Sequence, residues 1–349
     1  AKMSIEVDGK KMTMQKAALL LKSTDRAKRE EIYNKISSRR LQDEKVLDDL
    51  FDELISLRQK IAKNADFDNY RDYMFAAMGR FDYTPKDCFN FHDAIAKEIV
   101  PIINSFEQKR KNKLGNESYK PWDTAVDVDG LPPLKPFDGG TELTDLSIEC
   151  FNRLRPYFGE CLSTMKAMKH LDLESKNGKA PGGFMYPLYE IGVPFIYMNA
   201  VGSQRDLVTM VHEGGHAVHS FLSRDLSLTE FKSTPSEVAE LASMAMELLS
   251  MDHWDVFYDD AADLKRAKLE QLEKALETLP WVASIDKFQH WIYTTEHTAQ
   301  QRKEKWLSIS DELGNQIIDW EGNENVHANL WQKQLHLYEV PFYYIEYGM

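Results

Sequence analysis

Apolar residues at helical spacing recur through most of this 349-residue chain, and they constrain its fold more than any other feature. One clear run places seven apolar residues on a helical face: Val46, Leu47, Leu50, Phe51, Leu54, Ile55 and Leu57. Further helices are expected at about 94–106, from Ser203 onward, and at about 234–251, 259–278, 282–297 and 327–340. Strands are expected in an opening hairpin, Ser4–Val7 with Lys10–Met14, and near Val193–Asn199. The sequence therefore predicts a mainly α-helical fold with a small β-sheet.

Composition and charge limit the partners of the chain. Hydrophobic residues make up 43% of the sequence, which favours an ordered globular protein. The 56 acidic residues outnumber the 43 basic ones, giving a formal net charge of −13. Such a charge repels phosphate backbones and anionic lipid headgroups. We expect neither nucleic acid nor membrane as a partner, and the sequence does not predict the oligomeric state.

The cysteine pattern bears on the cellular compartment. Cys88, Cys150 and Cys161 are far apart, odd in number and without C-x-x-C spacing. They are expected to be buried free thiols in a reducing compartment. The N-terminal residues lack the pattern of a signal peptide, so a cytoplasmic location is the expectation.

The segment His212-Glu213-Gly214-Gly215-His216 carries the strongest chemical signal. Histidines four residues apart share one helical face, so both imidazoles can reach one zinc ion. Glu213, at the edge of that face, is placed to act as general base. The alternative is a pair of core histidines on an amphipathic helix. Because two adjacent glycines weaken a helix, however, their presence indicates that something packs closely there.

Glu240 is the predicted third protein ligand. Thr234–Glu237 has the pattern of a helix start, with Glu237 in a capping box. Glu240 follows one turn later and shares a face with a second carboxylate, Glu247, amid apolar residues. Two histidines and a glutamate leave a fourth position for water, as a single catalytic zinc per chain requires. Glu247 is expected to accept the free ring N–H of a ligand histidine, with an exposed or capping role as the alternative.

His219 is not expected to be a zinc ligand. It lies seven residues after His212, a rise of about 10.5 Å along the helix. Both rings could not meet one ion with His216 between them.

These residues resemble the oligopeptidase family that includes thimet oligopeptidase, neurolysin and oligoendopeptidase F, and the oligoendopeptidase F branch is the most similar. The resemblance is carried by three segments and one further residue: His212–Phe221, Val238–Ser243, His336–Gly348 and Glu247. It implies a multi-helical zincin-type metallopeptidase with a small sheet beside the HExxH helix and a deep substrate channel that admits short unfolded peptides.

The resemblance also implies roles for the C-terminal segment. His336, Tyr344 and Tyr347 would face the scissile carbonyl, where phenol groups can donate to the developing oxyanion. Without the resemblance, a tyrosine-rich packing segment would be the simpler interpretation. Gly182-Gly183-Phe184 and the strand at 195–199 resemble the family's edge strand, which would hold the substrate backbone by β-addition.

The predicted function is therefore zinc-dependent endopeptidase hydrolysis of short oligopeptides, with zinc-bound water as nucleophile. A catalytically inactive peptide-binding domain that retains zinc is one alternative, and a zinc hydrolase acting on another amide is a second. The proline-containing loop at 130–140 suggests a hairpin and helical part over 1–130 and a catalytic part over 131–349. A single catalytic domain lacking the family's N-terminal region is also compatible with the sequence.

Overall fold

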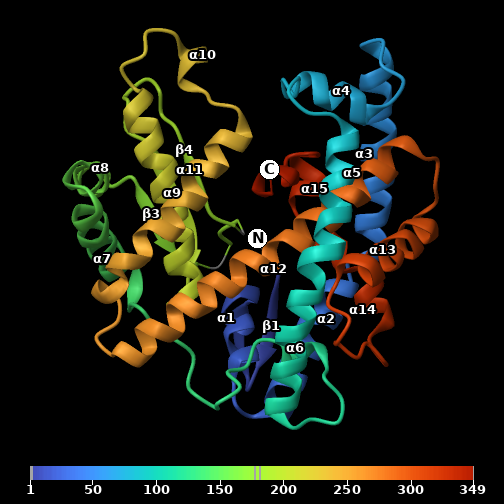
Figure 1. Cartoon of the computed structure of the whole chain (residues 1–349), viewed down its shortest axis with the longest axis horizontal. Coiled ribbons are helices and arrows are strands. Elements are labelled where there is room, and N and C mark those ends of the chain that lie inside the picture. Colours follow the sequence, from blue (N-terminus) through green and yellow to red (C-terminus); the bar gives the residue numbers. More distant parts are fainter. Residues whose placement is uncertain (1–2, 177, 181, 349) are drawn as a thin grey trace. The chain divides into compact units, whose positions relative to one another are not determined.

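Helices dominate the computed structural model, which describes residues 3–176, 178–180 and 182–348 (Figure 1). The backbone forms two units, one of Ala1–Ser23 with Pro132–Leu272 and one of Thr24–Leu131 with Glu273–Met349. The predicted division placed everything after residue 130 in one part, whereas the structure groups 273–349 with 24–131. Each unit has its own apolar core. Whether catalysis belongs to residues 131–349 alone stays a prediction.

The first unit begins with the predicted hairpin. Strands β1 (Ser4–Val7) and β2 (Lys10–Thr13) pair antiparallel. Asp8 and Gly9 have φ angles of 52° and 73°, as a tight primed turn requires. Helix α1 (Met14–Leu19) follows directly.

A three-stranded sheet in the first unit has the order β3-β5-β4. Strand β5 (Phe195–Ala200) is central, pairing parallel with β3 (Leu171–Glu174) and antiparallel with β4 (Phe184–Tyr186). The predicted strand and the small sheet are thus confirmed. β4 is an edge strand with exposed side chains at Phe184 and Tyr186.

The remaining helices of the first unit surround the HExxH segment. They are α7 (Gly139–Leu154), α8 (Pro156–Ala167), α9 (Gln204–Ser223), α10 (Thr229–Lys232) and α11 (Ser236–Leu249), with a 3₁₀ segment at Ser250–Val256. Helix α9 begins at the predicted capping box, in which Ser203 and Asp206 cap each other. Figure 1 shows α9 and α11 side by side, and the two helices pack closely.

The predicted start of α11 is wrong by one residue. Pro235, with extended backbone angles, precedes the first helical residue, Ser236, and no side chain caps the helix. Glu237 is therefore the second helical residue and does not complete a capping box with Thr234. The proline, which lacks an N–H group, fixes the extended backbone just outside the helix.

Every secondary-structure element described in the second unit is a helix or a helical turn. Its N-terminal part contains α2 (Arg26–Leu41), α3 (Glu44–Asn64), α4 (Tyr70–Ala77), α5 (Pro85–Ala94), a π-helical turn (Ile95–Ile99), α6 (Val100–Leu114) and a 3₁₀ turn (Pro121–Asp123). Its C-terminal part contains α13 (Ala299–Leu313), α14 (Glu324–Ala328), α15 (His336–Glu339) and 3₁₀ turns at Leu330–Lys333 and Tyr344–Tyr347.

Two predicted helix boundaries were wrong. The helices expected at 259–278 and 282–297 form one continuous helix, α12 (Ala261–Thr294), with Pro280 inside it. Proline removes one backbone hydrogen bond but does not always end a helix whose two halves are both well packed. The helix expected at 327–340 is instead the succession of short turns α14, Leu330–Lys333 and α15.

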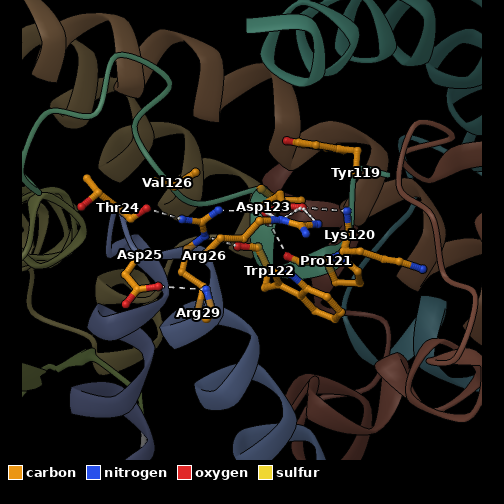
Figure 2. A network of polar contacts seen from close by, with 12 residues as sticks. Thr24, Asp25, Arg26, Arg29, Tyr119, Lys120, Pro121, Trp122, Asp123 and Val126 are labelled. Carbon is orange, nitrogen blue, oxygen red and sulfur yellow. Dashed lines mark hydrogen bonds and ion pairs between the residues drawn. The ribbon is translucent and has the colours of Figure 1, made fainter. Parts of the chain in front are cut away.

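A buried ion-pair network anchors α2 within the second unit (Figure 2). Asp123 is fully buried and accepts hydrogen bonds from Arg26 Nη2 and Arg29 Nη2, each at 2.8 Å. The backbone N–H of Lys120 donates to the same carboxylate. Burial would raise the pKa of Asp123, but the two guanidinium groups lower it below its ordinary value. The network ties α2 to the turn Pro121–Asp123.

The three cysteines are buried free thiols, as predicted. Among the described residues, no helix combines the length and apolar character needed to cross a lipid bilayer.

Candidate active site

Helix α9 presents two imidazoles on one face. The rings of His212 and His216 have centroids 4.9 Å apart and stand nearly perpendicular, at 86°. Both side chains are largely shielded from solvent. This is the arrangement predicted from the four-residue spacing.

Helix α11 brings Glu240 to these rings. Its Oε2 lies 3.2 Å from His212 Nε2 and 3.7 Å from His216 Nε2. One ligand atom from each of the three residues lies within 4.8 Å of the other two. Glu240 is only 2% exposed. The structure thus brings together the three predicted metal ligands.

The two glycines allow this close approach. A Cβ atom at Gly215 would lie 2.9 Å from the Cα of Ser243 on α11, and one at Gly214 would lie 2.7 Å from the Phe151 ring on α7. Such contacts are shorter than packed atoms allow, so any larger residue would force the helices apart. Gly215 therefore lets α11 pack directly on α9, one turn from Glu240.

Glu247 holds His212 from the other side. Its Oε1 lies 2.7 Å from His212 Nδ1, and Gln271 on α12 donates to its Oε2 at 2.7 Å. The predicted role for Glu247 matches this geometry, whereas no sequence pattern pointed to Gln271. Ser243, also missed, donates to Glu240 Oε2 at 3.3 Å. These bonds fix the orientation of a ring and a carboxylate.

The charges and acceptor atoms in this cluster favour a cation between them. With the Nδ1–H of His212 donated to Glu247, its Nε2 lone pair faces the Glu240 carboxylate, and two acceptors cannot share this position without a proton or a metal ion between them. Burial would lower the pKa of His212, but hydrogen bonds with Glu240 and Glu247 raise it to about 10. Burial would raise the pKa of Glu240, but the two histidines lower it well below its ordinary value. Both shifts report attraction between the imidazoles and the carboxylates, which favour a positive charge between them.

The donor set fits a zinc ion. Two imidazole nitrogens and one carboxylate oxygen from two helices are a known set for catalytic zinc, with typical bond lengths of about 2.0–2.2 Å. His212, His216 and Glu240 could hold such an ion after small side-chain adjustments.

Glu213 lies beside these residues. It is 6% exposed, and burial raises its pKa, with the charges of His212 and His216 acting in the opposite direction. A hydrogen bond from the backbone of Met185, in the edge strand β4, also lowers it. A carboxylate with a raised pKa holds a proton better near neutral pH, as a general base requires.

His219 is not part of the metal-binding group found among the described residues. It is half-buried, and burial lowers its pKa. This agrees with the prediction that His219 lies too far along α9 from His212 to bind the same ion.

The predicted residues of the C-terminal segment gather in the second unit. The rings of His336 and Tyr344 have centroids 4.9 Å apart, those of Tyr344 and Tyr347 5.2 Å, and Tyr347 Oη lies 3.5 Å from His336 Nε2. All three side chains are partly exposed. The structure thus brings these three C-terminal residues together in the second unit. It brings the predicted metal ligands and Glu213 together in the first unit. Their joint action on one substrate stays a prediction.

Two buried arginines hold this segment, and sequence reasoning missed both. Arg58 of α3 donates to the backbone carbonyl of Leu337 at 3.0 Å and to Tyr293 Oη at 2.7 Å. Arg80 pairs with Glu346, with Nε 3.0 Å from Oε1, and also donates to the carbonyl of Phe342. Phe342 has a φ of 66°, which is uncommon for a non-glycine residue and is held by these contacts. Each contact joins positions more than 230 residues apart, so no local pattern could reveal it.

Known proteins show what the chain resembles. The model of peptidase family M3 matches residues 19–349. The oligoendopeptidase F homolog of Lactococcus lactis subsp. lactis (strain IL1403) is 21% identical over 271 residues, which cover 76% of this chain and 44% of the relative. The homolog of Borreliella burgdorferi is 23% identical over 291 residues, covering 82% and 48%.

A solved structure of PZ peptidase A with an inhibitor superposes with a TM-score of 0.94 at 28% identity. The match covers 99% of this chain and 61% of that one. The chain thus spans about half the length of the curated relatives it matches.

Proposed function

Because this chain belongs to peptidase family M3, we propose that it is a metallopeptidase that hydrolyses short unfolded peptides with one catalytic zinc ion. The observation that carries the proposal is the convergence of His212 Nε2 and His216 Nε2 on Glu240 Oε2, within 3.2 and 3.7 Å. These three residues would hold the ion. When bound, zinc supplies a Lewis acid that polarises the peptide carbonyl and lowers the pKa of water.

Glu213 moves the proton in this proposal. Its carboxylate takes a proton from the attacking water and returns it to the leaving amine nitrogen, so that one residue serves as base and then as acid. Its burial supports this role, because the raised pKa lets it hold the proton between the two transfers.

The supporting residues keep the ligands in place. Glu247 accepts the Nδ1–H of His212, which leaves Nε2 as the donor atom toward the ion. Gln271 and Ser243 hold the two carboxylates. Such contacts restrain the ligand side chains before the ion binds, so that less conformational entropy is lost on binding.

The C-terminal aromatic group supplies hydrogen-bond donors in the proposal. His336, Tyr344 and Tyr347 donate to the oxyanion that develops on the scissile carbonyl. Their partial exposure and mutual packing support this role, since the polar ends are accessible and the rings are restrained.

The edge strand β4 is the proposed backbone-binding element. Its outer edge carries N–H and C=O groups that β5 does not pair, and an extended peptide could add there as a further strand. Met185 of β4 interacts with Glu213, so a peptide added at this edge would lie beside the proposed base. The acidic charge of the chain supports peptides, rather than nucleic acid or membranes, as partners. A cytoplasmic location stays a prediction.

Hydrolysis of an internally quenched peptide by the wild type and by Glu213→Gln tests the proposal. We expect kcat to fall by about 10²–10⁴-fold in the variant while zinc content is unchanged. Glu237→Gln, which alters a glutamate at the start of α11, is the matched control and should retain activity.

Three outcomes would contradict the proposal. Full activity of Glu213→Gln would remove Glu213 from the mechanism. A wild type and variant that are both inert, yet bind zinc and peptide, would indicate a peptide-binding domain. Hydrolysis of a non-peptide amide but of no peptide would indicate a different hydrolase.

A further inference from the structure

A second group of metal-binding side chains lies in the core of the second unit. Helix α5 carries Cys88 and His92, and α12 carries Asp286 and His290. Each pair is separated by four residues, so each shares one helical face. The exposed fractions of the four residues lie between 0% and 3%.

The four side chains converge. One ligand atom each from Cys88, Asp286 and His290 lies within 4.8 Å of the other two. His92 Nε2 is 2.8 Å from Asp286 Oδ2, and His290 Nε2 is 3.2 Å from the same oxygen. The surroundings are aromatic, with Phe89 and Phe342 packed against the His290 ring at 4.9 and 5.5 Å.

Several polar atoms of this cluster have no hydrogen-bond partner among the described residues. They are Asp286 Oδ1, His92 Nδ1 and both ring nitrogens of His290. The contact of His290 Nε2 with Asp286 Oδ2 is an ion pair only if the imidazole is protonated. Leaving a buried polar group unpaired costs about 1–3 kcal/mol. One cation could partner Asp286 Oδ1 and one ring nitrogen of His290, so these two atoms point to a missing ligand.

We propose that Cys88, Asp286 and His290 form a second site for a divalent zinc-like cation, with His92 holding the Asp286 carboxylate in orientation. Thiolate, imidazole and carboxylate together favour zinc over magnesium or calcium, which prefer oxygen ligands alone. A thiolate and a carboxylate also carry the two negative charges that neutralise one divalent ion.

The nearest other charges leave this balance unchanged. Arg80 is close enough to act on the Cys88 thiol, but it is paired with the buried Glu346. In the absence of a cation, burial and the charge of Asp286 raise the pKa of the thiol. Binding an ion would release the thiol proton to solvent and form the sulfur–metal bond without any oxidation or reduction.

The site would join α5 to α12, two helices whose metal-binding residues are almost 200 positions apart in the sequence. It lies within one unit and contains sulfur. The proposed catalytic site in the first unit contains nitrogen and oxygen donors alone. This chemical difference allows the two sites to be measured separately.

Cobalt substitution of the full chain tests the second site. The full-length protein, reduced and stripped of metal, is titrated with Co²⁺, and absorption is recorded for the wild type, for His212→Ala/His216→Ala and for Cys88→Ser. We expect thiolate-to-cobalt charge-transfer absorption in the near ultraviolet for the first two proteins and its loss in Cys88→Ser. Cys150→Ser, which alters a buried thiol of the first unit, is the matched control and should keep the absorption.

Metal content gives an independent readout. After equilibration with zinc and removal of the excess, the wild type should retain two ions per chain and His212→Ala/His216→Ala one. A wild type that shows no sulfur-to-cobalt absorption and retains at most one zinc would overturn the proposal, leaving a metal-free polar cluster. Because the decisive spectra come from proteins with Cys88 intact, misfolding of Cys88→Ser would not prevent this test. Peptide hydrolysis is not measured, so the result is independent of the proposed function.

Discussion

At the scale of single residues, Glu247 orients the His212 ring within the proposed zinc site. Its carboxylate accepts the ring N–H at 2.7 Å and is itself held by Gln271. Replacing it by alanine leaves the ring free to rotate and removes a negative charge from the site. We expect Glu247→Ala to weaken zinc binding by about 10–100-fold.

Competition with a chromophoric zinc chelator measures this change. Glu237→Ala, on the same helix but outside the site, serves as the control and should bind zinc like the wild type. Unchanged affinity in Glu247→Ala would show that the carboxylate does not orient the ligand.

Residue-level patterns in the sequence predicted much of the first site. The spacing of His212 and His216 defines a shared face, and Glu240 is a carboxylate flanked by apolar residues, so both signals are local. Gln271, Arg58 and Arg80 carry no such signal. Gln271 and Arg58 are ordinary polar residues on helices, and Arg80 lies in the loop between α4 and α5. The importance of each comes from a partner that only the tertiary fold supplies.

At the scale of elements, the contact between α9 and α11 determines whether Glu240, the proposed third ligand, reaches the histidines. Gly215 permits this contact, because a Cβ there would lie 2.9 Å from the Ser243 backbone. We expect Gly215→Ala to lower the free energy of unfolding by about 1–3 kcal/mol and to weaken zinc binding.

Chemical denaturation together with zinc titration would check the Gly215 prediction. Ser220→Ala, at a partly exposed position of α9, is the control. A Gly215→Ala protein as stable as the wild type, with equal zinc affinity, would show that α11 is not held at close approach.

The network around Asp123 gives a pH-dependent prediction for α2. Asp123→Asn would leave the buried Arg29 without its countercharge, and we expect a loss of about 3–5 kcal/mol in unfolding free energy at neutral pH. The pKa of Asp123 is lowered by folding, so its stabilisation is fully present above the unfolded pKa of about 3.9 and is lost as pH falls through the lower folded value.

Urea denaturation between pH 7 and pH 3 measures this difference. The difference in free energy of unfolding between wild type and Asp123→Asn should be constant at neutral pH and should become smaller below about pH 4. Asp129→Asn, an exposed carboxylate paired with Lys113, should show little change at any pH. If this difference instead becomes larger as the pH falls, folding does not lower the pKa of Asp123.

Elements were predictable where local chemistry determines them. The hairpin has a turn that matches its sequence, and α9 has a complete capping box. The prediction failed at Pro235 and Pro280, because proline restricts the backbone without saying whether a helix begins after it or continues through it. Packing against other segments decides between the two.

At the scale of the whole molecule, the sequence indicated the family and the mainly helical class, but not the way the chain divides. Helix α12 contributes residues to both units, and 273–349 share a core with 24–131. Such grouping depends on contacts between distant segments, which helical periodicity does not encode. The Cys88, Asp286 and His290 cluster was missed for the same reason.

The central claim is that two histidines of α9 and a glutamate of α11 bind one zinc ion. Anomalous diffraction on either side of the zinc absorption edge, from crystals of the chain grown with zinc, tests it most directly. We predict an anomalous peak about 2.0–2.2 Å from His212 Nε2, His216 Nε2 and a Glu240 carboxylate oxygen. Density that shows Glu240 turned away from both rings, with no anomalous peak beside them, would contradict the claim.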